Sequence, residues 1–154
     1  MSKKAILAIL DGWGIGLNDE VSALKQAKTP FIDYALQTFP NTTLEASGLA
    51  VGLPAGQMGN SEVGHMNLGA GRVVYQNLVR LNMAVETGSL GREHVIQNAF
   101  EYARANNKKV HFIGLVSNGG VHSHINHLKG LLTAAHEFGL DKNVFVHAFT
   151  DGRD

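Results

Sequence analysis

The chain has 154 residues, enough for one ordinary domain or two small ones, and its hydrophobic content of 44% is sufficient for a packed core. Its 13 Lys and Arg residues balance 13 Asp and Glu residues, so no basic excess indicates binding to nucleic acid. The absence of cysteine excludes disulfides, thiol nucleophiles and thiolate-bound zinc. The absence of a long apolar stretch argues against a membrane span, and we expect a cytoplasmic protein with no nucleic-acid or membrane partner.

The first half of the chain predicts two strands and two helices. Residues 5–10 form a continuous apolar run, which is typical of a strand buried on both faces of a parallel sheet. A Thr-Pro dipeptide predicts a helix that starts at residue 30 and is stopped by Pro40. Residues 42–46 are a weaker strand candidate. A second helix is expected over residues 61–68, after a loop rich in glycine and proline.

The second half predicts a regular α/β arrangement. Two helices are expected over residues 78–85 and 93–105, the second with apolar residues on one side. A strand over 110–116, a helix over 123–138 and a strand over 144–149 then form a β-α-β unit, whose two strands are expected to be parallel neighbours.

Three loops follow predicted strands, and ligands of open α/β sheets collect at the carboxyl ends of the strands. These loops comprise residues 11–16, 117–124 and 151–154. Asp11 directly follows the first apolar run, where a carboxylate often binds a hard cation such as Mg²⁺ or Mn²⁺. The alternative is an ordinary aspartate in a turn before glycine.

Ser61 lies between a glycine-containing loop and a predicted helix start. The unpaired N–H groups and the positive dipole end of a helix N-terminus favour a phosphate ester at such a hydroxyl. A serine is a poor nucleophile unless a base or a metal activates it. The alternative is a serine that only caps the helix.

A dense group of histidines, His122, His124 and His127, has the composition of a zinc site. Because two of them fall within a predicted helix and one precedes it, we do not expect all three to converge on one ion. A single histidine, His122, facing an anionic ligand is the preferred interpretation. Arg153, on the loop after the neighbouring strand, is a candidate to join it around a phosphate or carboxylate, unless it belongs to an ordinary charged turn.

Five segments of the chain, taken together, resemble the motifs of one enzyme family, the 2,3-bisphosphoglycerate-independent phosphoglycerate mutases. The resemblance extends in order along the whole chain, and its longest block surrounds Ser61. The segments are residues 10–14 (LDGWG), 45–54 (EASGLAVGLP), 56–67 (GQMGNSEVGHMN), 119–124 (GGVHSH) and 149–154 (FTDGRD).

The resemblance implies an α/β protein with two incomplete units. Residues 1–76 would be the N-terminal part of an alkaline-phosphatase-like metal-binding domain. Residues 77–154 would be the N-terminal part of a substrate-binding phosphotransferase domain with parallel strands.

The resemblance also implies roles for individual residues. It makes Ser61 the phosphorylated nucleophile, and it makes Ser61 and Asp11 ligands of a pair of Mn²⁺ ions. It assigns phosphoglycerate binding to His122, Arg153 and Asp154.

The activity implied is that of an isomerase of glycolysis and gluconeogenesis, which interconverts 3-phosphoglycerate and 2-phosphoglycerate through a phosphoserine and acts as a monomer. Family members are several times longer than this chain, so we expect an N-terminal fragment that is inactive by itself. Three alternatives remain: a phosphatase or phosphopentomutase relative with the same metal site, a histidine-rich metal-binding module, and a fragment with no function of its own.

Overall fold

The structure, a computed structural model, describes residues 4–153 and combines helices with a parallel two-stranded sheet. Short 3-10 helices are labelled η. The elements are η1 (Asp19–Val21), α1 (Ala23–Gln26), α2 (Pro30–Thr38), η2 (Gly48–Val51), α3 (Ser61–Ala70), α4 (Asn77–Glu86), η3 (Leu90–Arg92), α5 (His94–Ala105), β1 (Val110–Val116), α6 (Ile125–Glu137) and β2 (Val144–Thr150).

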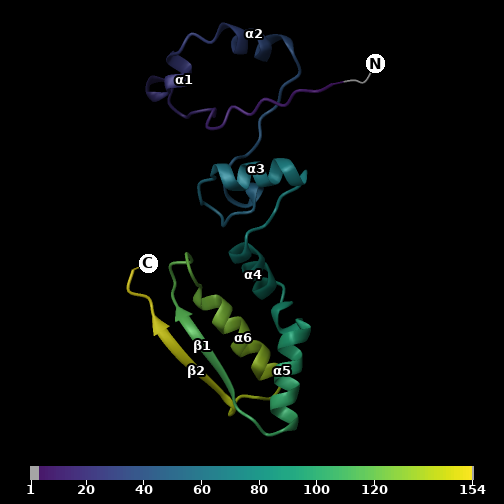
Figure 1. Ribbon diagram of the computed structural model, residues 1–154. Coiled ribbons are helices and arrows are strands. Elements are labelled where there is room, and N and C mark those ends of the chain that lie inside the picture. Colours follow the sequence, from purple (N-terminus) through teal and green to yellow (C-terminus); the bar gives the residue numbers. More distant parts are fainter. Residues whose placement is uncertain (1–3, 154) are drawn as a thin grey trace.

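The β-α-β unit predicted for the second half is confirmed. Strands β1 and β2 pair in parallel, with Val110 opposite Val144 at one end and Val116 opposite Thr150 at the other. Helix α6 connects them, and α5 and α6 lie along the strand pair (Figure 1). Gly139 ends the α6 segment with a φ of 72°, the left-handed conformation that glycine adopts without strain.

The main hydrophobic core lies between these two helices and one face of the strands. Phe100 of α5 is only 2% exposed and packs with Ala134 and Ala135 of α6. Its ring makes edge-to-face contacts with Phe112 and Phe138, at centroid distances of 6.3 and 5.4 Å. Aromatic pairs of this geometry add to the stabilisation from buried apolar area.

A second, smaller core supports the segment around α3. Its buried members are Val51, Leu53 and Val63, which bring η2 and the first turn of α3 together. Gly52 lies so close to residues 74–75 that a Cβ atom placed on it would be 2.2 Å from the Val74 carbonyl oxygen. The segment from η2 to α4 is therefore folded back on itself, above α4 in Figure 1.

The two strands predicted in the first half are wrong. Residues 5–10 and 42–46 have no strand conformation, and none of residues 4–47 is buried. A buried strand requires neighbouring strands for its backbone hydrogen bonds, and no described residue provides one for these segments.

The helix expected from residue 30 is confirmed as α2, which ends before Pro40. None of the helices within residues 4–153 has the length and apolar character needed to cross a bilayer.

Candidate functional site

Asp11 and Ser61 lie in direct contact. The Ser61 hydroxyl donates a hydrogen bond to Asp11 Oδ2 over 2.5 Å. Asp11 occupies a turn that is closed by the hydrogen bond from Trp13 N–H to the Leu10 carbonyl, 3.0 Å long. Ser61 is the first residue of α3. The structure thus brings a carboxylate and a hydroxyl to the N-terminus of a helix.

Asn60, rather than Ser61, caps α3. Asn60 has extended backbone angles, and its Oδ1 accepts a hydrogen bond of 3.1 Å from Val63 N–H. Asparagine is among the preferred capping residues because its short side chain reaches this N–H group. The reading of Ser61 as a simple capping serine is therefore wrong, and its hydroxyl is free to face Asp11.

The loop before Ser61 is held by a close backbone approach at Gly59. A Cβ atom on Gly59 would lie 1.8 Å from the carbonyl oxygen of Ala46, a distance that no side chain tolerates. Only glycine therefore allows residues 46–47 to pass this close to the residue before the cap. This contact fixes the direction from which the chain enters α3.

A cavity of about 1090 Å³ opens around the Asp11–Ser61 pair, and we call it the serine cavity. His65, one helical turn after Ser61, also lines it, and its Nδ1 lies 2.8 Å from the Ser61 carbonyl oxygen. Because a carbonyl can only accept, this ring nitrogen carries the proton and Nε2 is the acceptor in the neutral ring. Polar residues that line the cavity and that sequence reasoning missed are Glu45, Ser47, Asn60, His65, Asn67 and Arg72.

Asp11 and Ser61 are suitable donors for a hard cation, because both present oxygen. They are too few to hold one alone. Across residues 4–153 the structure groups no three His, Cys, Asp or Glu side chains that could bind a metal ion together. The described part of the chain therefore holds no complete cation site, and any further ligands would have to come from elsewhere.

The second group of predicted site residues lies at the end of the sheet. Because Val116 pairs with Thr150, the loops that follow β1 and β2 leave the strand pair at the same end. His122 is on the first loop and Arg153 on the second, where Arg153 N–H donates to Asp151 Oδ1 over 2.9 Å. Neither His122 nor Arg153 lines the serine cavity. Asp154 lies outside the described residues.

The three histidines of the 122–127 segment, all within the described residues, do not form a zinc site. His124 caps α6, with its Nδ1 accepting from Asn126 N–H over 3.2 Å. His127 Nε2 lies 2.7 Å from Asn82 Oδ1 and joins α6 to α4. Burial lowers the pKa of His127, and the nearby His124 lowers it further, so His127 is neutral near pH 7.

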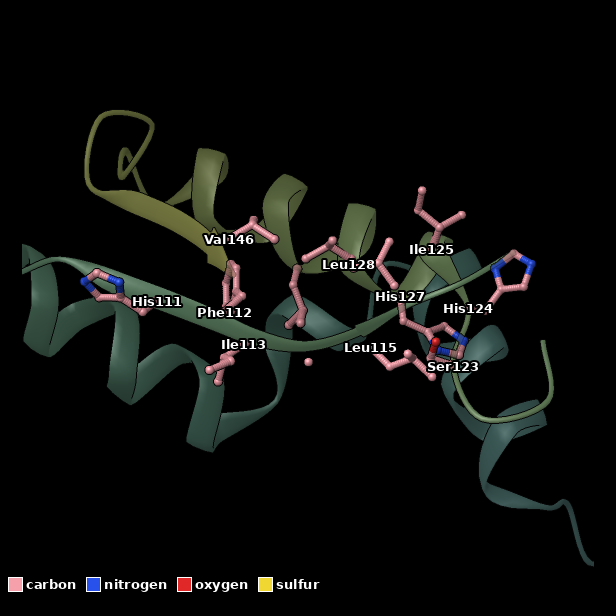
Figure 2. A pocket seen from close by; sticks show the side chains of 13 residues that line it. His111, Phe112, Ile113, Leu115, Ser123, His124, Ile125, His127, Leu128 and Val146 are labelled. Atoms are coloured by element: carbon pink, nitrogen blue, oxygen red, sulfur yellow. The ribbon is translucent and has the colours of Figure 1, made fainter. Parts of the chain in front are cut away.

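A second cavity, of about 410 Å³, runs between β1 and α6. Figure 2 shows Ser123, His124 and His127 gathered at one end of it and His111 at the opposite end of β1. Apolar side chains such as Phe112, Ile113 and Leu128 lie between them. An apolar stretch thus separates His111 from the three polar residues at the other end of this cavity.

Comparison with known proteins gives consistent results along the chain. The family described as BPG-independent PGAM N-terminus matches residues 81–154. Proteins named 2,3-bisphosphoglycerate-independent phosphoglycerate mutase from Flavobacterium johnsoniae and Bacteroides fragilis are 60% and 53% identical to this chain over 154 residues. The protein of the same name from Salinibacter ruber is 54% identical over 154 residues, covering 99% of this chain.

Each match involves only part of the relative. The chain spans about 30% of the length of the curated relatives from Flavobacterium johnsoniae and Bacteroides fragilis, which align with all of it, and 29% of the Salinibacter ruber relative. The resemblance found in the sequence is thereby confirmed: over its whole length, the chain is similar to about 30% of the length of proteins named 2,3-bisphosphoglycerate-independent phosphoglycerate mutase.

Proposed function

We propose that this chain supplies the phosphoryl-carrying serine of a 2,3-bisphosphoglycerate-independent phosphoglycerate mutase. The activity is the interconversion of 3-phosphoglycerate and 2-phosphoglycerate through phosphorylated Ser61. The observation that carries the proposal is the 2.5 Å hydrogen bond between Ser61 and Asp11 at the N-terminus of α3.

The arrangement supports a two-step transfer. In the first step Ser61 Oγ releases its proton to water and attacks the phosphorus of 3-phosphoglycerate, the bond from phosphorus to the C3 oxygen breaks, and this oxygen takes up a proton from water. In the second step the C2 hydroxyl of the bound glycerate releases its proton to water and attacks phosphoserine, the bond from phosphorus to Ser61 Oγ breaks, and Ser61 Oγ takes up a proton again. Asp11 orients the Ser61 hydroxyl and accepts its hydrogen bond, and the helix N-terminus favours the negative charge of the phosphoryl group.

The proposal includes two Mn²⁺ ions, with Asp11 and Ser61 among the ligands and the remaining ligands supplied from outside this chain. When bound, such ions favour the deprotonated hydroxyl and neutralise charge on the phosphoryl oxygens. The donor chemistry of Asp11 and Ser61 supports this assignment, because both are hard oxygen ligands.

The substrate residues are proposed to be His122, Arg153 and Asp154, on the two loops that leave the same end of the strand pair. In this proposal residues 1–76 belong to an alkaline-phosphatase-like metal-binding unit and residues 77–154 to a substrate-binding unit. The complete enzyme is proposed to be a cytoplasmic monomer.

A chimera tests the proposal. This chain replaces the matching 30% of the Flavobacterium johnsoniae mutase, to which it is 60% identical, and interconversion of the two phosphoglycerates is assayed with Mn²⁺. We expect activity in the chimera and a loss of about 10³-fold or more in Ser61→Ala. Ser89→Ala, a serine outside the serine cavity, is the matched control and should retain activity. Full activity of Ser61→Ala would contradict the proposal.

A further inference from the structure

Helix α3, which carries Ser61, has little apolar surface to hold it in place. It is 10 residues long, and Val63 is its only buried residue, at 4% exposure. Most helices in proteins are stabilised by packing a whole apolar face, which α3 does not have. Its orientation must therefore depend on other contacts.

Asn67 provides two such contacts through one side chain. Its Nδ2 donates to the Val51 carbonyl over 3.1 Å, and its Oδ1 accepts from Val74 N–H over 2.7 Å. The donor bond joins α3 to η2, and the acceptor bond joins α3 to the segment that leads to α4. Asn67 is half-buried, where hydrogen bonds that lose a partner are costly.

Asn67 and Val63 act on the same side of α3. They are four residues apart, so they lie on one face of the helix; Val63 packs in the cluster with Val51 and Leu53, and Asn67 donates to the Val51 carbonyl. Ser61 precedes Val63 by two residues, which at 3.6 residues per turn places it about 200° around the helix. Fixing the Val63–Asn67 face therefore fixes the direction in which Ser61 points.

We propose that Asn67 is a positioning residue for Ser61, which it keeps against Asp11 by fixing the rotation of α3 about its own axis. The inference rests on the proposed function of Ser61 as the phosphoryl carrier. Asn67 also lines the serine cavity, so its role must be separated from a direct contact with substrate. A positioning residue lowers kcat with little effect on KM, whereas a residue that binds substrate in the ground state raises KM.

The first measurement is hydrogen exchange in the 154-residue chain, and it does not depend on activity. Asn67→Ala is expected to speed exchange at Val74 and also at Val63 and Gly64 in the first turn of α3, by about tenfold or more. Amides of α5 and β1, which belong to the separate Phe100 core, should not change. Asn67→Asp keeps an acceptor for Val74 N–H and should have a smaller effect. Unchanged exchange at Val63 and Gly64 in both variants would overturn the proposal.

The second measurement is the activity of the chimera, with Asn98→Ala as the matched control. Asn98 is an exposed asparagine on α5 whose side chain lies against the ring of His94. Asn67→Ala should lower kcat by about 10- to 100-fold, with KM within about twofold of its original value.

If Ser61→Ala is inactive but Asn67→Ala has the kcat of Asn98→Ala, the positioning role is wrong and the function of Ser61 stands. A raised KM with unchanged kcat would also overturn it. If Ser61→Ala is fully active, the proposed function fails, and hydrogen exchange alone decides the role of Asn67.

Discussion

Ser61 and Asp11 are 50 positions apart in the sequence, and their side chains meet at 2.5 Å. The contact joins a turn in the exposed N-terminal part of the chain to the first residue of α3. Three features hold the serine side of it: the cap at Asn60, the close approach at Gly59, and the two hydrogen bonds of Asn67. The position of the Ser61 hydroxyl is therefore set by backbone geometry and hydrogen bonds more than by apolar packing.

The 154-residue chain should bind Mn²⁺ weakly. Asp11 and Ser61 contribute one carboxylate and one hydroxyl, and a tight site for such an ion needs about six oxygen or nitrogen ligands. Isothermal titration of the isolated chain should show no saturation at micromolar Mn²⁺, and the chimera should bind the ion more tightly. Asp11→Asn should weaken binding in the chimera, whereas Asp19→Asn, in the exposed helix η1, should not. Tight binding of Mn²⁺ by the isolated chain would show that it supplies more ligands than Asp11 and Ser61.

Gly59→Ala should disrupt the entry into α3. The new Cβ would overlap the Ala46 carbonyl oxygen, so one of the two segments has to move. We expect faster hydrogen exchange at residues 61–64 and, in the chimera, loss of most activity. Gly69→Ala is the control, because a Cβ there meets no atom within 4 Å, and alanine should stabilise the helix by about 0.5–1 kcal/mol. Equal behaviour of the two variants would contradict this account of the loop.

Phe100→Ala should strongly destabilise the β-α-β unit. Phe100 is 2% exposed and contacts Phe112 and Phe138, so its removal leaves a cavity and should cost about 3–5 kcal/mol of unfolding free energy. Tyr102, on the same helix but 63% exposed, provides the matched control, and Tyr102→Ala should cost about 0.5 kcal/mol or less. Urea unfolding followed by circular dichroism measures both. A similar loss of unfolding free energy in the two variants would show that Phe100 does not have a central place in the core.

Stability should depend on pH through His136 and Asp141, which are joined by a hydrogen bond and ion pair. This hydrogen bond raises the pKa of His136, aided by the charge of Asp141, and it lowers the pKa of Asp141. The contribution of His136 is present below its unfolded-state pKa of about 6.5 and is lost as pH rises through the raised value. The contribution of Asp141 is present above its unfolded-state pKa of about 3.9 and is lost as pH falls through the lowered value.

The two shifts in pKa define a pH window, between the unfolded-state pKa values of Asp141 and His136, in which both groups contribute to stability. The melting temperature of Asp141→Asn should fall below that of the original chain most clearly at about pH 5 to 6, and the difference should shrink above about pH 8. Asp19→Asn serves as the control. The effect should be small because both side chains are exposed. A difference in melting temperature that stays constant from acid to alkaline pH would exclude the ion pair as its cause.

The second half of the fold could be predicted from the sequence almost to the residue. The strand expected over 110–116 is β1, and the strand expected over 144–149 is one residue longer as β2. Continuous apolar runs with β-branched residues and the amphipathic pattern between them are local signals. Helix α6 begins at Ile125 rather than at 123, because His124 is its cap.

The first half could not be predicted in the same way. The run of residues 5–10 has the composition of a buried strand, but strand conformation depends on neighbours that the described chain does not provide, and Ile6 is 96% exposed. The nearness of Asp11 to Ser61 is expected only from the resemblance, which makes both residues ligands of one pair of metal ions. The role of Asn67 has no local signal, because it depends on carbonyl and N–H groups of residues 51 and 74 that only the fold brings together.

Locating the phosphate on the protein during turnover tests directly whether Ser61 carries it. The chimera is mixed with radiolabelled 3-phosphoglycerate and Mn²⁺, quenched in acid within one turnover, and digested for mass spectrometry. Phosphate is expected on Ser61, and none on the corresponding peptide of the Ser61→Ala variant. Steady turnover with the label on a different residue, or with no label on the protein at any time, would contradict this expectation.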